Sequence, residues 1–205
     1  MFCQHYEKLV QTLEERGYRV HGAATPDDAR QIVLTLVGRE TSVGLGGSMT
    51  LSALGMYEAL TQAGNTVYSH WVTPQAVDPD IYIKENSADW YLSSTNALTM
   101  DGKLVNTDGT GNRLAGMFAG PKRVCLIVGK NKLVEDVQAG FARIKEVAAP
   151  QNAKRLHRAT PRATDGKCQD CASPQRICRV SSVIEYRPGW VEELHLVLVD
   201  ASLGY

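Results

Sequence analysis

Apolar residues in the first part of the chain recur at the spacing of amphipathic helices. One such pattern runs from Phe2 to Arg16 and is ended by Gly17. A second runs from Ala29 to Val37. It follows a helix start, because Thr25 can cap the first turn and Pro26 suits its first position. Each pattern predicts a helix whose apolar face packs against a core.

Short apolar runs bounded by turn residues predict strands, and longer periodic runs between them predict further helices. The predicted strands cover residues 18–20, 41–45, 65–71, 89–94, 103–105, 123–128, 180–186 and 194–199. The further helices cover residues 49–63, 111–118 and 133–147. A turn at residues 100–103 predicts that strands 89–94 and 103–105 form a β-hairpin. This alternation predicts an α/β fold with a largely parallel sheet.

This regular pattern stops after Pro150. Residues 154–179 contain seven Lys or Arg residues against two acidic residues, with neither helical nor strand periodicity. Strand patterns then resume at Val180. We therefore expect the basic segment 154–179 to be an insertion before the final strands.

The composition adds broad limits. A chain of 205 residues with 43% hydrophobic residues can bury a core, and its length predicts a single domain over residues 1–205. The formal net charge of zero argues against nucleic acid as a partner. No apolar run approaches the ~20 residues of a membrane span. The first ten residues lack a signal-peptide pattern, so we expect no membrane partner and a cytoplasmic location.

A glycine-rich turn follows the predicted strand 41–45 and opens the next helix. Backbone N–H groups and hydroxyls at such a turn can bind an anion or a phosphate group. The Walker spacing is absent, and Met49 replaces the third glycine of a dinucleotide-binding turn. A tight turn with a serine cap is the alternative. The candidate ligand-binding residues here are Gly46, Gly47, Ser48 and Thr50.

The stretch from Asp89 to Gly120 is unusually rich in small and polar residues. Its carboxylate, amides and guanidinium can orient a carboxylated or polyhydroxylated small molecule. The alternative is an Asx-rich turn with its arginine in a surface ion pair. Asp101 and Asp108 are the candidate catalytic bases by position. The candidate ligand-binding residues are Asn96, Asn106, Gly109, Thr110, Gly111, Asn112 and Arg113.

Three of the five cysteines lie in the insertion, with the spacing Cys168-x2-Cys171-x6-Cys178. Two thiolates three positions apart can share one metal, and a third can reach it from a short loop. Zinc would need a fourth ligand, whereas a [4Fe–4S] cluster held by three cysteines leaves one iron open. Reduced cysteines without a metal are the alternative. The candidate fourth ligands are His157, Asp165, Asp170 and Cys3.

Three other features are a buried cysteine, a lysine-containing turn and the histidines. Cys125 lies in an apolar run and is expected to be a buried small hydrophobe. The turn Lys130–Lys132 either places a lysine at the carboxyl edge of the sheet, where α/β proteins bind ligands, or is a solvated turn. The five histidines show no metal-ligand spacing, so each is expected to be structural.

Together these motifs resemble the LUD-domain family, named for lactate utilization and formerly DUF162. The resemblance is carried by the stretches Gly44–Gly55, Ser93–Arg113 and Gly120–Ile144. The segment Thr160–Arg179 resembles the cysteine segment of a short subgroup in which a further cysteine often stands at the position of Arg162. The resemblance implies a Rossmann-like NagB/RpiA/CoA-transferase-like layer fold with a cleft between the glycine turn and the polar stretch.

The resemblance also implies a function. Family members are linked to oxidation of L-lactate to pyruvate beside iron–sulfur partner subunits, so the expected partners are a small anionic metabolite and redox-partner subunits. A homo-oligomer is also compatible with the sequence. The expected cofactor is a [4Fe–4S] cluster or zinc. A metal-stapled regulatory or assembly subunit and a sugar-phosphate isomerase or transferase are the alternatives.

Overall fold

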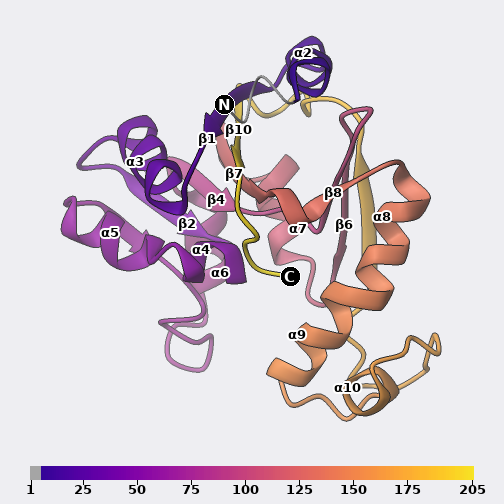
Figure 1. The fold of residues 1–205 in the computed structure, drawn as a ribbon. Helices are drawn as coiled ribbons and strands as arrows, with labels where there is room; N and C mark the ends of the chain where they lie inside the picture. Colours follow the sequence, from indigo (N-terminus) through magenta and orange to yellow (C-terminus); the bar gives the residue numbers. More distant parts are fainter. Residues whose placement is uncertain (1–5) are drawn as a thin grey trace.

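A computed structural model describes residues 6–205 and places six parallel strands in a central sheet (Figure 1). The strand order is β1-β10-β7-β4-β2-β3, and every neighbouring pair is parallel. Their bounds are β1 Arg19–Ala23, β2 Ser42–Leu45, β3 Thr66–Tyr68, β4 Trp90–Ser93, β7 Arg123–Gly129 and β10 Glu193–Val199. The largely parallel sheet predicted from the sequence is therefore confirmed.

A smaller sheet, of order β8-β5-β6-β9, lies beside the central one. Its strands are β5 Ala97–Thr99, β6 Leu104–Asp108, β8 Leu133–Val134 and β9 Val180–Ile184. The predicted pairing of strands 89–94 and 103–105 was wrong: β4 belongs to the central sheet, and β5 is the antiparallel partner of β6. The cause is that β5 has three residues, too few for a visible alternation.

Alternating side chains of the central sheet supply two separate hydrophobic cores. Tyr91 on β4 belongs to the core shared with the second sheet. Trp90 and Leu92, its neighbours on the same strand, belong to the core beneath α3 (Pro26–Val37) and α5 (Met56–Gln62). Figure 1 shows α3, α4 and α5 grouped on one side of the central sheet, and the second sheet with α8 on the other.

Most predicted helices are present, but two differ in extent. The helix expected over 49–63 is two helices, because Gly55 adopts a left-handed φ of 59° between them. The helix expected over 133–147 begins later, since residues 133–134 form β8, and Asp136 caps α8. The remaining helices are α2 Glu7–Glu15, α4 Met49–Ala53, α6 Ile81–Ser87, α7 Asn112–Phe118, α8 Val137–Arg143, α9 Ala149–Arg155 and α10 Pro161–Asp165. None of the described helices is long and apolar enough to cross a bilayer.

Pro150 does not end the helical segment as its position suggested. A π-helical turn, Ile144–Ala148, separates α8 from α9, and Pro150 lies in the first turn of α9, where a proline needs no N–H partner. Helical structure therefore extends to Arg155, inside the segment expected to be irregular. The rest of the insertion, with α10, lies between α9 and β9, as predicted.

The first helix is confirmed from Glu7 onward, and Phe2 to His5 lie outside the described residues. Thr25 forms the predicted cap of α3. Its hydroxyl accepts the N–H of Asp28, and the Asp28 carboxylate accepts the N–H of Thr25. This reciprocal pair satisfies two donors at the start of the helix.

A histidine pair links the edge strand β1 to β10 and predicts how stability depends on pH. The rings of His21 and His195 stack at 5.2 Å, with Nε2 of His21 2.9 Å from Nδ1 of His195. Burial lowers the pKa of both rings. The unfolded chain therefore binds more protons than the native one below about pH 6.5, and stability falls as pH is lowered through that value.

We expect urea unfolding to show this loss between about pH 7.5 and about pH 5.5. The double variant His21→Gln/His195→Gln should have a flatter stability profile in this range. His157→Gln, the same substitution at an exposed position, is the matched control. An unchanged slope in the double variant would show that this pair is not the cause.

Candidate functional site

The carboxyl ends of three neighbouring strands meet beside a cavity of ≈ 630 Å³. The chain passes from β2 to β3 on one side and then returns to β4 on the other side of β2, so the strand order reverses here. Open α/β sheets bind ligands outside such a reversal. Gly47 and Ser48 follow β2, Ser94 to Asn96 follow β4, Lys132 follows β7, and all of them line the cavity.

The predicted glycine turn contributes only part of its residues to this cavity. Gly47 and Ser48 line it, and the Ser48 hydroxyl also accepts the N–H of Leu51 at 3.4 Å, so the cap expected as an alternative is present as well. Gly46 instead packs in the interior, where an added Cβ would lie 2.3 Å from the hydroxyl of Tyr91. Thr50 is fully buried behind the turn.

Arg113 is the centre of the polar stretch and is buried at 9% exposure. Its Nε donates to Asp108 at 2.9 Å, and one terminal nitrogen donates to the backbone oxygen of Ser94 and to the Asn106 side chain. The other donates to the Asn96 side chain at 2.8 Å and lies 2.7 Å from the Asp108 carboxylate. Arg113 is therefore not in the surface ion pair considered above, and its donors hold the polar loops together.

Some of the remaining predicted residues of the polar stretch line the cavity, and the others hold its loops in place. Asn96, Gly109, Thr110 and Asn112 line the cavity. Asn106 is fully buried and accepts hydrogen bonds from Arg113, Thr95 and the N–H of Asn96. Gly111 precedes α7 with a φ of 89°, a conformation that favours glycine.

The two aspartates predicted as bases occupy different places. Asp108 lines the cavity, but both of its oxygens accept hydrogen bonds, one from Arg113 and the other from the N–H of Leu114. Asp101 lies on the turn between β5 and β6 and does not line the cavity. Hydrogen bonds from Thr99 and Lys103 lower the pKa of Asp101. Neither carboxylate faces the cavity as a free base.

A histidine that lines the cavity is held by a buried glutamate, and this pair was not anticipated. The fully buried Glu85 on α6 accepts the backbone N–H of His70 at 2.5 Å and its ring Nδ1 at 2.7 Å. This contact places the proton on Nδ1 and leaves Nε2 as an acceptor. An added Cβ on Gly47 would lie 3.0 Å from that Nε2, so the ring adjoins the glycine turn. The two residues are fifteen positions apart on different elements, so their spacing carries no recognisable motif.

Cationic side chains dominate the opposite wall. Among the described side chains that line the cavity only Asp108 is acidic, and it is paired with Arg113. The arginines at positions 155, 158, 176 and 179 line the side formed by α9 and the insertion. Arg155 stacks over the Trp71 ring at 4.5 Å and so bridges the two walls. Arg158 is exposed and has no ion-pair partner within residues 6–205. The cavity thus favours an anion.

The cysteine insertion meets this cavity at Cys178, but its thiols do not form a metal site as arranged. The buried Arg162 guanidinium lies 2.6 Å from the sulfur of Cys168. Arg176 lies 3.4 Å from the sulfur of Cys178. Residues 6–205 contain no group of three or more possible metal ligands. The thiols fit arginine contacts better than a cluster or zinc.

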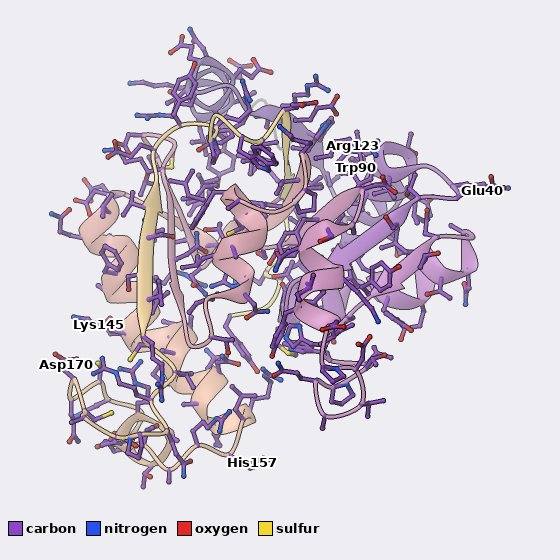
Figure 2. All side chains as sticks on the ribbon, turned by 180° about the vertical axis from the view of Figure 1, so that it is seen from behind. Glu40, Trp90, Arg123, Lys145, His157 and Asp170 are labelled. Carbon is purple, nitrogen blue, oxygen red and sulfur yellow. The ribbon has the colours of Figure 1, made fainter. Side chains whose placement is uncertain are left out.

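The predicted fourth ligands do not change this result. Figure 2 shows His157 and Asp170 at opposite edges of the insertion. Asp165 accepts hydrogen bonds from Gln169 and the N–H of Lys167, and Cys3 lies outside the described residues. The cluster and zinc therefore stay predictions, which metal analysis of the purified protein tests. Cys125, in contrast, is fully buried as expected, and burial raises the pKa of its thiol to about 12.

Comparisons with known proteins agree with this architecture. A family model described as the LUD domain matches residues 6–199. A DUF162 family protein from Deinococcus radiodurans has a similar structure, with 13% identity, a TM-score of 0.52, and coverage of 95% of this chain and 98% of that one. Ribose 5 phosphate isomerase A from Neisseria gonorrhoeae aligns over 56% of this chain and 57% of that chain at 14% identity, but its TM-score of 0.35 is too low to support an argument. No curated protein gives a significant match.

At this identity the first structure is informative about the fold alone. Its nearly complete coverage of both chains, together with the parallel central sheet, confirms the Rossmann-like α/β layer fold that the resemblance implied. The identity of a ligand must come from the chemistry of the cavity itself.

Proposed function

Because this chain belongs to the LUD-domain family, which is associated with lactate utilization, we propose that it binds a small 2-hydroxy or 2-oxo carboxylate in the cavity beside Gly47. The observation that carries the proposal is the lining, to which α9 and the insertion contribute four arginines. Arg176 is paired with Asp170, whereas Arg155, Arg158 and Arg179 have no acidic partner among the described residues. A carboxylate adds a second charge to its hydrogen bonds with a guanidinium and can accept two of them side by side, whereas a neutral molecule of the same shape lacks that charge.

The opposite wall offers groups for the second functional group of such an acid. The Ser48 hydroxyl and Nε2 of His70 both face the cavity beside Gly47. With its proton held on Nδ1 by Glu85, His70 can accept the proton of a 2-hydroxyl group. The geometry favours His70 for this role over Asp108, whose oxygens are engaged, and over Asp101, which lies elsewhere. Oxidation of the acid would also need an electron acceptor, which in this proposal a partner subunit supplies.

The proposal predicts selectivity for the carboxylate. Calorimetric or NMR titration should show binding of L-lactate and pyruvate, while lactamide, the neutral analogue, binds more weakly by about 10-fold or more, the worth of one charge-assisted hydrogen bond. Added salt should weaken lactate binding, because Arg158 is exposed.

A matched pair of variants locates the effect. Arg158→Gln should weaken lactate binding without changing lactamide binding, and Arg39→Gln, an exposed arginine that does not line the cavity, should change neither. The proposal fails if lactamide binds as tightly as lactate, or if none of the three molecules binds.

A further inference from the structure

Lys132 is a lysine almost entirely removed from solvent at the edge of the cavity. It ends the short 3-10 turn after β7, is 4% exposed, and lines the cavity beside Ser94. Its Nζ has two polar neighbours, the Thr50 hydroxyl at 2.8 Å and the Ser94 hydroxyl at 2.8 Å. No carboxylate of the described residues pairs with it. Buried lysines are normally paired with an acid, so this one needs another explanation.

The protons of the two hydroxyls decide how Nζ is bonded. The Ser94 hydroxyl donates to the backbone oxygen of Ile127 at 2.6 Å, and the Thr50 hydroxyl donates to that of Leu203 at 3.2 Å. Each hydroxyl has one proton, so each must accept from Nζ. A neutral amine has two N–H bonds to give, and both are then used. Its lone pair remains, and an ammonium ion would carry a third N–H for which the described residues offer no further acceptor at Nζ.

The electrostatic surroundings favour the same neutral form. Burial lowers the pKa of Lys132 well below its ordinary value, and the charges of Arg143 and Arg113 lower it further. Arg143 donates to the backbone oxygens of Asn131 and Asn96, so its cation is fixed near the turn. Asp108, the acidic side chain among the described residues of the cavity lining, is already paired with Arg113.

We propose that Lys132 is a nucleophilic amine that condenses with the carbonyl carbon of a 2-oxo acid in the cavity to form an imine. The choice of a 2-oxo acid rests on the function proposed above, whereas the reactive amine rests on the bonding of Nζ alone. A 2-oxo acid has its carbonyl next to the carboxylate. Arginines that hold the carboxylate therefore also limit where the carbonyl carbon can lie relative to Lys132.

The step balances without a further reactant. The Nζ lone pair attacks the carbonyl carbon, and one N–H proton passes to the carbonyl oxygen to give a carbinolamine. The second N–H proton then leaves with that hydroxyl as water, and a C=N bond replaces the C–N bond. His70, which lines the same cavity, is available to carry the proton to the departing oxygen. No electrons are exchanged.

Reductive trapping tests the condensation. The full chain is incubated with pyruvate and cyanoborohydride, digested, and analysed by peptide mass spectrometry. We expect one adduct, on the peptide containing Lys132. Lys132→Met should lose it, whereas Lys130→Met should keep it, because Lys130 is a half-exposed lysine paired with Asp200. The methionine variant should fold, since both hydroxyls keep their carbonyl partners.

A second probe separates this inference from the proposed function. Limiting formaldehyde with reductant needs no anion site, and it should methylate Lys132 of the wild-type chain ahead of the exposed lysines. If pyruvate binds in a titration but leaves no adduct, the imine is contradicted. If formaldehyde does not favour Lys132, the reactive amine is contradicted. If formaldehyde favours Lys132 but pyruvate does not bind, the reactive amine is supported and the proposed substrate class is wrong.

Discussion

Replacing Arg113 by methionine is expected to lower the free energy of unfolding by about 3–5 kcal/mol, the range for breaking a buried ion pair. The guanidinium gives hydrogen bonds to Asp108, to the Asn96 and Asn106 side chains, and to two backbone oxygens. Without it the Asp108 carboxylate, 7% exposed, loses its only ion-pair partner within the described chain. The loops that carry Asn96 and Asp108 would lose their shared anchor.

Urea unfolding measures this loss, and two variants make it specific. Arg113→Lys should recover little of it, because an ammonium group cannot reach acceptors spread around a planar guanidinium. Arg123→Met should cost less than about 1 kcal/mol, since Arg123 forms a half-exposed pair with Asp89 at 3.8 Å. Figure 2 shows Arg123 beside Trp90, and the guanidinium lies 5.0 Å from the centre of that buried ring. Equal losses in Arg113→Met and Arg123→Met would mean that the buried network is not a stabilising unit.

The largest effect on binding is expected from Gly47→Val. An added Cβ at this position would lie 2.6 Å from the Trp71 ring nitrogen and 3.0 Å from Nε2 of His70. The branched side chain would therefore occupy the space beside Ser48 where the acid is proposed to bind. We expect lactate and pyruvate affinity to fall by about 100-fold or more, equivalent to about 2.8 kcal/mol.

Stability should change much less in this variant, because Trp71 is 38% exposed and can move away. Gly189→Val is the matched control, since nothing lies within 4 Å of its added Cβ, and it should alter neither binding nor stability. Titration and thermal unfolding of the same preparations provide both readouts. Normal lactate affinity in Gly47→Val would place the ligand elsewhere.

The parts of the fold that could be predicted are those set by local sequence. The cap at Thr25 and the alternation of apolar runs depend on residues within one element, and both are confirmed. The glycine turn after β2 was also visible, because a strand, two glycines and a serine stand together. The composition also separated the basic segment from the final strands, although its first two residues belong to α9.

The parts that could not be predicted depend on contacts between distant segments. The chain leaves the central sheet at Ser94, and only the folded structure shows that a three-residue strand then starts a second sheet. His70 and Glu85 meet because β3 and α6 pack together, and no spacing rule covers them. Lys132 was considered at the sheet edge, but its burial between two hydroxyls follows from the positions of Thr50 and Ser94.

The insertion shows the same limit for function. Its cysteines suggested a separate metal centre. In the structure, however, its last residues line the cavity. There the backbone N–H of Arg179 donates to the backbone oxygen of Asp108 at 2.8 Å. The arginines of the segment are therefore as informative as its thiols. The arginines reach the cavity because β9, which follows the insertion, pairs with β6.

The π-helical turn Ile144–Ala148 also determines how this segment can change in length. Each residue of an α-helix advances the side-chain direction by about 100°. A π-helical turn takes about one residue more than an α-helical turn, so deleting one residue between Ile144 and Ala148 would restore a regular helix and leave the directions of Asn152 and Arg155 nearly unchanged. We therefore expect this turn to be the place where the helical segment can lose one residue and still present the same wall to the cavity.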